Sequence, residues 1–236
     1  MSAPEISIVI PVYNEEPILH AAIVDLRERL AGCDFSYEIL LAENGSRDAT
    51  VEVACELAAR YPVVRCLSIG EPNYGRALRR GIEEATGEIV VCDEIDLCDV
   101  GFHRRAVALL REEPVDMVIG SKLMPGARDE RPILRHGASH FYNGLLRLAL
   151  GFSGTDTHGL KAFRKQALMP IVRSCVVERD VFASELVIRA YRAGLSIREI
   201  PVRLMEKRPP SINLLRRVPG VLRALLQLGW AIRVRG

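Results

Sequence analysis

Blocks of apolar and polar residues alternate along the first half of the chain, and they predict strands and helices in turn. Short apolar runs without helical spacing are typical of the buried strands of a parallel sheet. These expected strands are residues 5–11, 37–43, 63–69, 89–92 and 115–121. The amphipathic segments between them, with apolar positions at helical spacing, are residues 17–30, 49–60, 74–86 and 101–112. Such alternation with short links predicts a mostly parallel α/β sheet with right-handed crossovers.

The alternation stops after residue 122. Residues 124–135 are rich in glycine, proline and charge, and we expect a mobile loop there. Helical segments are expected near 136–150, 164–173 and 180–193, followed by a strand at 197–203 and an amphipathic helix beyond Ser211. There is no internal repeat, so we expect one α/β domain, residues 1–210, with a C-terminal helical elaboration at 211–236.

An acidic cluster follows the strand at 89–92. It contains Asp93, Glu94, Asp96 and Asp99, and carboxylates this close repel one another unless a cation or proton lies among them. Oxygen ligands favour Mg²⁺ or Mn²⁺, which usually take substrate phosphates as further ligands. The alternative, a solvated acidic turn that caps the next helix, stays open at this point.

Polar residues also follow the other expected strands, at 11–15, 43–48 and 73–76. The carboxyl ends of parallel strands lie along one edge, so these segments and the acidic cluster should meet in one crevice. Asn14 is placed to cap the helix at 17–30. No G-x-G-x-x-G follows the first strand, which argues against the usual dinucleotide fold.

Charge is distributed unevenly along the chain. Residues 1–130 carry 13 Lys/Arg and 24 Asp/Glu, whereas residues 131–236 carry 19 and 6. An acidic, metal-suited half and a basic, anion-suited half indicate two different tasks. Nucleic acid is not the expected anion, because zinc-finger spacing, helix-turn-helix and aromatic stacking patterns are missing from the sequence.

The six cysteines lack C-x-x-C spacing, and most lie in apolar segments, which is typical of reduced thiols in the cytoplasm. The sequence shows no signal peptide and no apolar run of about 18 residues, the length that spans a bilayer. We therefore expect a soluble or peripheral cytoplasmic protein.

Together, these segments resemble the GT-A (Rossmann-like) fold of family 2 glycosyltransferases. That family carries a first strand ending in P-x-Y-N-E, a second ending in D-D-G-S-x-D-x-T, an N-x-G-x-x-x-A segment and a D-x-D metal motif. Residues 156–164, 182–190 and 208–211 narrow the likeness to dolichol- or polyprenol-phosphate hexosyltransferases. The chain departs from the pattern at Glu43 and Asn44, where aspartates are usual.

The resemblance implies a role for each matching residue. Those implied to bind the nucleotide and its diphosphate are Pro11, Tyr13, Asn14, Glu15, Glu43, Asn73, Gly75, Arg76 and Asp93. The metal motif reads either as D-x-x-D, from Asp93 to Asp96, or as E-x-D, from Glu94 to Asp96. We choose Glu94 and Asp96 as ligands of Mg²⁺ or Mn²⁺, with Asp93 close behind.

The implied reaction moves a hexose, with inversion, from GDP-mannose or a UDP-hexose to a polyprenyl phosphate. The residues implied to act on the reacting groups are Arg131, Arg135, Ser139, Asp156, Lys161 and Arg208. Arg135, Ser139 and Asn143 match an R-x-x-x-S-x-x-x-N spacing that puts all three on one helix face. His103 and His158 show no metal-ligand spacing and are expected to be structural or at the surface.

Two other functions stay open: transfer to a hydroxyl acceptor with Asp156 or Asp180 as base, and nucleotide-sugar binding without turnover. The C-terminal segment alternates Leu214, Leu222, Leu226 and Trp230 with arginines, which suits a membrane surface. The competing interpretation packs this segment on the protein's own core or on a second subunit of a homo-oligomer.

Overall fold

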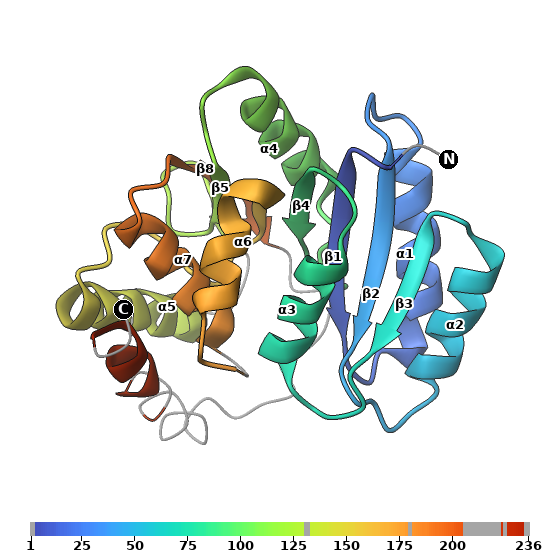
Figure 1. Cartoon of the computed structure of the whole chain (residues 1–236), viewed down its shortest axis with the longest axis horizontal. Helices are drawn as coiled ribbons and strands as arrows, with labels where there is room; N and C mark the ends of the chain where they lie inside the picture. Colours follow the sequence, from blue (N-terminus) through green and yellow to red (C-terminus); the bar gives the residue numbers. More distant parts are fainter. Residues whose placement is uncertain (1–2, 130–132, 179–180, 205–222, 224–225, 234–236) are drawn as a thin grey trace.

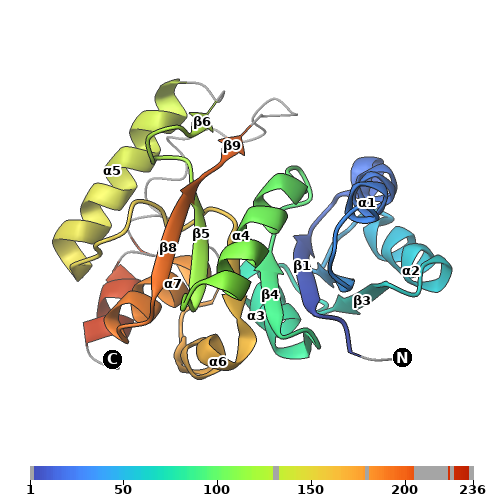
Figure 2. The same ribbon diagram turned by 90° about the horizontal axis from the view of Figure 1, so that it is seen from above.

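The computed structural model describes residues 3–129, 133–178, 181–204, 223 and 226–233. Over these residues, a seven-stranded sheet lies between two layers of helices (Figures 1 and 2). The short strands β6 and β9 form a separate two-stranded sheet. The α/β fold with a mostly parallel sheet is therefore confirmed.

The elements predicted up to residue 121 are all present, with ends that move by no more than two residues. They are β1 (Ile6–Val12), α1 (Glu16–Leu30), β2 (Tyr37–Glu43), α2 (Thr50–Arg60), β3 (Val64–Ser68), α3 (Tyr74–Glu84), β4 (Ile89–Cys92), α4 (Val100–Glu112) and β5 (Met117–Ser121). The agreement is close because β1, β2, β4 and β5 are mostly apolar and almost fully buried, whereas β3, at the edge of the sheet, is only partly buried.

The second half differs more from expectation. Its elements are β6 (Arg128–Asp129), α5 (Ile133–Leu150), β7 (Lys161–Arg164), α6 (Lys165–Ser174), α7 (Phe182–Arg192), β8 (Ile197–Pro201) and β9 (Arg203–Leu204). The expected loop at 124–135 contains β6, which pairs with β9, and α5 begins inside it at Ile133. The expected strand at 197–203 divides into β8 and β9 at Val202, whose side chain is buried.

Strand β7 was not predicted. The strands run in the order β3-β2-β1-β4-β7-β5-β8, and β7 is antiparallel to both of its neighbours. It has four residues, two of them charged, and it leads directly into α6, so neither a period of two nor an apolar run marks it. Its register places Lys161 opposite Cys92, at the carboxyl end of β4.

The strands contribute alternately to two apolar layers. In β1, Ile6, Ile8 and Ile10 pack in the layer with α1, α2 and α4, whereas Val9 packs in the layer with α3, α6 and α7. The two sets alternate because successive side chains of a strand point to opposite faces. The second layer also takes in Leu228 and Ile232 from the C-terminal segment.

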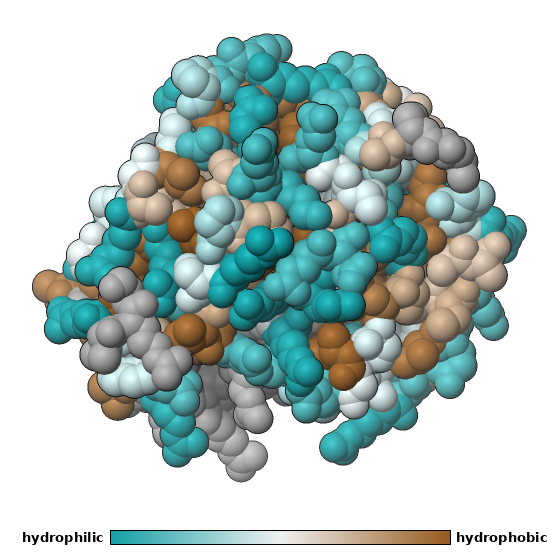
Figure 3. Space-filling view, viewed as in Figure 1, coloured by the Kyte–Doolittle hydropathy of each residue, from teal (hydrophilic) through white to brown (hydrophobic). Residues whose placement is uncertain are grey.

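The described part of that segment, residues 226–233, is helical. Leu228, Ala231 and Ile232 are buried, as the own-core interpretation predicts, whereas Leu226 and Trp230 remain exposed. The residues of the predicted apolar stripe before Leu226 lie outside the described part of the chain. On the face shown in Figure 3, hydrophilic side chains prevail around the middle and apolar ones form small separate groups.

Candidate active site

The turns after β1 and β2 are joined by hydrogen bonds at the carboxyl edge of the sheet. The Asn14 amide donates to Ser46 Oγ (3.0 Å), and the Arg47 amide donates to Asn14 Oδ1 (2.9 Å). Asn14 has a φ of 54°, a left-handed conformation that asparagine tolerates better than most residues. The prediction that Asn14 caps α1 is wrong: Glu15 occupies the cap position without a side-chain cap bond, because the Asn14 side chain bonds the second turn instead.

Glu43, the last residue of β2, forms hydrogen bonds with the same turn. Its side chain accepts from the Ser46 amide and from Ser68 Oγ, and the residue is 1% exposed. The implied role of Glu43 in binding the base stays a prediction, and only lone pairs outside these two bonds could serve it. Pro11 and Glu15 are half-buried beside this turn, whereas Tyr13 is exposed and accessible to a ligand.

Asn73 connects three parts of the site at the start of α3. Its Oδ1 caps the helix by accepting from the Arg76 amide (3.1 Å), and its own amide donates to Asn44 Oδ1. Its Nδ2 donates to Glu178 Oε2 (3.0 Å), which brings the segment after α6 to the same edge. A capped helix start with charge of both signs nearby is a suitable place for a diphosphate.

Gly75 and Arg76, the other two predicted site residues of this segment, differ in their exposure to solvent. Gly75 is buried in the first turn of α3. Arg76 is exposed and forms an ion pair with Glu71, so its predicted contact with the diphosphate remains a prediction.

The acidic cluster forms the turn between β4 and α4. Asp93 is 2% exposed, and its carboxylate accepts from the amides of Glu94 (2.6 Å) and Asp99 (3.1 Å). Asp99 caps α4 by accepting from the Phe102 amide (3.0 Å). The capping alternative therefore describes Asp99, whereas Glu94 is exposed and Asp96 is half-buried.

Charged groups of both signs lie near Glu94 and act on its pKa in opposite directions. Protein atoms crowd its carboxyl group and raise its pKa, Asp93 and Asp96 add to the increase, and Lys122 and Lys161 oppose it. Glu94 as a whole residue is nevertheless exposed to solvent. Burial likewise raises the pKa of the Tyr74 hydroxyl, and Glu94 adds to that effect.

Asp156 and Lys161 reach this edge through β7 and the turn before it. Asp156 is 1% exposed, and Lys122 Nζ lies 2.9 Å from its Oδ2. Burial alone would raise the pKa of Asp156, but Lys122 and the His158 amide more than offset it, so the pKa lies below its usual value. Lys161 is 3% exposed and donates to the Gly159 carbonyl (2.6 Å), and burial lowers the pKa of its ammonium.

Three residues near the cluster were not among the predicted site residues: Tyr74, Lys122 and His103. Lys122 directly follows β5, so the rule that polar residues after parallel strands meet at one edge could have found it. His103 is buried, with its ring 2.5 Å from Asp93, so of the two expected places for this residue the surface is excluded.

Other predicted residues are not described. Arg131 and Arg208 lie outside the described residues. Arg135 and Ser139 fall in α5, whose backbone is described there without their side chains. Asn143, on the same predicted face of that helix, is buried.

The donor set fits a hard divalent cation without forming a complete cage. Among the described residues, no group of three or more His, Cys, Asp or Glu side chains is arranged to hold a metal ion. Mg²⁺ in nucleotide sites is commonly held by one or two carboxylates, with phosphates and water completing its shell. Glu94 and Asp96, on the open side of the turn, match that smaller requirement.

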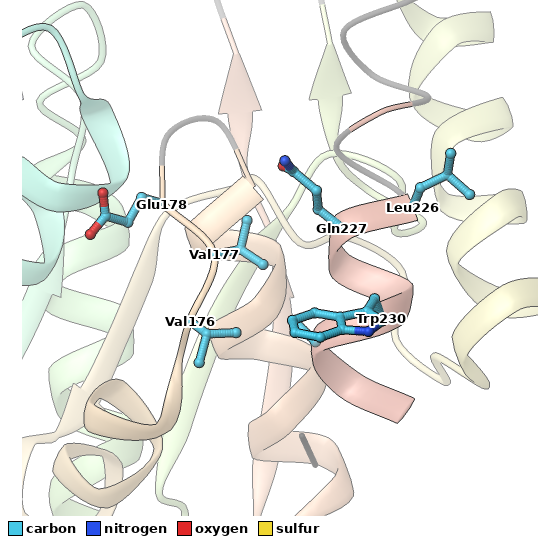
Figure 4. A pocket seen from close by; sticks show the side chains of 7 residues that line it. Val176, Val177, Glu178, Leu226, Gln227 and Trp230 are labelled. Carbon is cyan, nitrogen blue, oxygen red and sulfur yellow. The ribbon is translucent and has the colours of Figure 1, made fainter. Parts of the chain in front are cut away.

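A groove of about 600 Å³ lies between the segment after α6 and the C-terminal helix (Figure 4). Trp230 points across it toward Val176 and Val177, and Glu178 stands at its end nearer α3. Val176, Leu226 and Trp230 are exposed large hydrophobic residues. Glu178 also accepts the hydrogen bond from Asn73, so this residue lies both at the groove and at the start of α3.

The sheet order, the polar carboxyl edge and the acidic turn define a GT-A fold. The chain belongs to glycosyltransferase family 2: the model of that family, described as glycosyl transferase family 2, matches residues 7–171.

Two curated relatives are similar to this chain over most of its length. Glycosyltransferase AglD of Haloferax volcanii is 32% identical over 237 residues, covering 98% of this chain but only 38% of AglD. The dolichyl-phosphate beta-glucosyltransferase of Drosophila melanogaster is 30% identical over 219 residues, covering 86% of this chain and 67% of the relative. The chain thus spans well under half of AglD and two thirds of the fly enzyme.

Solved structures of glucosyl-3-phosphoglycerate synthase from Mycobacterium tuberculosis share the fold. The complex with Mn²⁺, UDP and glucosyl-3-phosphoglycerate has a TM-score of 0.65 at 21% identity, covering 97% of this chain and 80% of that one. The complex with Mg²⁺ and UDP has a TM-score of 0.63 at 22% identity, covering 95% and 79%. At this identity, the likeness establishes the fold alone.

Proposed function

We propose that this glycosyltransferase moves a hexose from a nucleoside diphosphate sugar to a polyprenyl phosphate, with inversion and with the help of Mg²⁺ or Mn²⁺. The observation that carries the proposal is the acidic turn of Glu94 and Asp96, which lies at the same sheet edge as the capped start of α3. The fly relative's name supports the lipid phosphate acceptor and a glucose-type sugar. The UDP complexes of the mycobacterial enzyme favour UDP over GDP as the donor nucleotide.

Glu94 and Asp96 would hold the metal ion, which when bound would offset the negative charge of the leaving diphosphate. The protein's own groups orient the donor around that charge. Asn73 fixes the start of α3 and its amide dipoles, and Tyr13 offers an exposed ring to the base. The ammonium groups of Lys122 and Lys161 offset part of the negative charge of the carboxylates near them, such as Glu94.

The acceptor needs no general base in this reaction. A phosphate monoester is already ionised near pH 7, so one of its oxygens can attack the anomeric carbon directly. The new carbon–oxygen bond forms as the bond from that carbon to the diphosphate breaks, and the nucleoside diphosphate leaves with the electron pair. Positioning and charge stabilisation therefore supply most of the rate. The predicted acceptor ligands remain Arg131, Arg135, Lys161 and Arg208.

Asp156 is poorly suited to act as a base for a hydroxyl acceptor. Its low pKa and its ion pair with Lys122 make it a weak proton acceptor. This observation weighs against Asp156 as the base of the hydroxyl alternative, whereas Asp180, the other candidate base, lies outside the described residues.

The decisive experiment is a donor panel of UDP-glucose, GDP-mannose and UDP-GlcNAc, assayed with a polyprenyl phosphate in Mn²⁺ and in EDTA. We expect metal-dependent transfer of glucose. Transfer to 3-phosphoglycerate or another hydroxyl compound, with none to the lipid, would establish the hydroxyl alternative. Donor binding without any transfer or hydrolysis would establish a binding protein without turnover.

A further inference from the structure

A buried histidine lies directly beneath the acidic turn. His103 is in the first turns of α4, with its side chain 1% exposed, and its Nε2 lies 2.5 Å from Asp93 Oδ2. The Asp93 side chain is 0% exposed. The histidine is ten residues further along the chain, so the contact joins the end of β4 to the body of α4.

The Asp93 carboxylate is occupied from three directions. Its Oδ1 accepts from the Glu94 amide, and its Oδ2 accepts from the Asp99 amide and faces His103. Two backbone amides already donate to the Asp93 carboxylate, and the geometry of the third contact fits an N–H at His103 Nε2. His103 Nδ1 has no hydrogen-bond partner within the described part of the chain.

The turn sorts its side chains by direction. Asp93, Ile95 and Cys98 point inward and are buried, whereas Glu94 is exposed and Asp96 is half-buried. Asp93 thus lies on the buried side of the turn, and Glu94 lies on its exposed side.

We propose that His103 is a positioning residue of the metal-binding turn: it holds Asp93 inward, so that Glu94 and Asp96, and not Asp93, are presented to the cation. The part that concerns the cation rests on the proposed function. With Asp93 held inward, the predicted metal motif is the E-x-D of Glu94 and Asp96 and not the D-x-x-D that starts at Asp93. Groups that orient a ligand from behind typically change metal affinity by about 10- to 100-fold when they are removed.

The test compares His103→Leu, which fills the space without a donor, with His103→Gln, which keeps an N–H near the position of Nε2. Mn²⁺ binding to the full chain in the presence of UDP is measured by electron paramagnetic resonance, and hydrogen exchange is followed at the amides of Glu94 and Asp99. Glu38→Gln is the control. Glu38 is a buried, hydrogen-bonded carboxylate near the amino end of β2, whereas the acidic turn lies at the carboxyl edge of the sheet.

We expect His103→Leu to speed exchange at both amides and to weaken Mn²⁺ binding about tenfold or more, with His103→Gln close to wild type. Glu38→Gln should leave Mn²⁺ binding unchanged. Unchanged exchange in His103→Leu, or equal behaviour of the Leu and Gln variants, would overturn the anchor. If wild type binds no Mn²⁺, the proposed metal fails, while hydrogen exchange still judges the anchor.

A measurement on the unmodified protein covers the case in which His103→Leu does not fold. Nitrogen-15 NMR of the imidazole should show the Nε2–H tautomer with a hydrogen-bonded proton. A ring protonated only at Nδ1 would contradict the proposal.

Discussion

At the residue scale, the carboxylates of the acidic turn have separate tasks although they are near neighbours in sequence. Asp93 is held inward by backbone amides and His103, Asp99 caps α4, and Glu94 and Asp96 remain on the open side. Spacing alone cannot separate these tasks, because it does not tell which side chain points into the core.

Asp96→Ala should reduce transfer activity by a hundredfold or more, since it removes one of two carboxylates proposed to hold the charge-stabilising cation. Steady-state transfer at saturating Mn²⁺ would measure this. Asp25→Ala is the matched control, because Asp25 is exposed on α1 and forms only a surface ion pair with Arg29. Normal turnover in Asp96→Ala would remove Asp96 from the metal site.

Asp156 allows a prediction about pH. Its folded-state pKa is lowered, so its stabilising contribution is present above the unfolded pKa of about 3.9 and is lost as pH falls through the folded value. Asp156→Asn should therefore cost about 1 to 3 kcal/mol at pH 7, and the difference from wild type should shrink below about pH 4. Urea unfolding of both proteins at pH 7, 5 and 3 would test this. A difference that stays constant with pH would show that the Asp156 charge is not involved.

At the scale of elements, the second half of the chain is held together by polar contacts as well as by apolar packing. Glu185 on α7 is 0% exposed, accepts from the amides of Val176 and Val177, and pairs with Arg189 (2.8 Å). Arg189 also donates to the Ala231 carbonyl (3.0 Å). One buried pair thus joins α7, the segment that carries Glu178, and the C-terminal helix.

Arg189→Met should destabilise the protein by about 3 to 5 kcal/mol, because it leaves a buried carboxylate without its counter-charge. Arg198→Met is the control: the exposed Arg198–Glu113 pair should contribute no more than about 1 kcal/mol. Urea denaturation at pH 7 measures both. Similar losses in the two variants would mean that burial of the Glu185–Arg189 pair does not set its strength.

At the scale of the whole molecule, the uneven charge and the exposed apolar residues of the C-terminal helix suggest where the enzyme works. Within the described residues, no helix combines the length and the apolar character needed to cross a bilayer. Residues 203–236 carry eight Lys/Arg and one acid. We propose that the chain meets the proposed lipid acceptor at a membrane surface, with Leu226 and Trp230 entering the headgroup boundary.

In liposome flotation, the full chain should bind vesicles that contain anionic lipid, and Leu226→Ser with Trp230→Ser should weaken binding severalfold, because both side chains are exposed. Phe141→Ser is the control for an exposed apolar residue on another helix, α5. High salt should also weaken binding, since each basic residue near an anionic surface adds about 1 kcal/mol. A double variant that floats like wild type would contradict the role of this helix.

The sequence by itself determined the strands and helices up to β5 and the edge at which the polar residues gather. Most strands there are buried apolar runs, the helices between them have apolar positions at helical spacing, and the carboxyl ends of parallel strands lie along one edge. Glu94 and Asp96 as metal ligands came from the same pattern together with the family resemblance, and they remain a prediction.

Only the tertiary structure decided which groups share the site from distant parts of the chain. Strand β7 is too short and too charged to have a period of its own, and it becomes a strand because β4 and β5 offer it two partners. It brings Lys161 to the acidic turn, while other chain segments bring Lys122 to Asp156 and Glu178 to Asn73. The inward direction of Asp93 likewise depends on a helix packed behind it, because a buried carboxylate must find its hydrogen-bond donors wherever the fold supplies them.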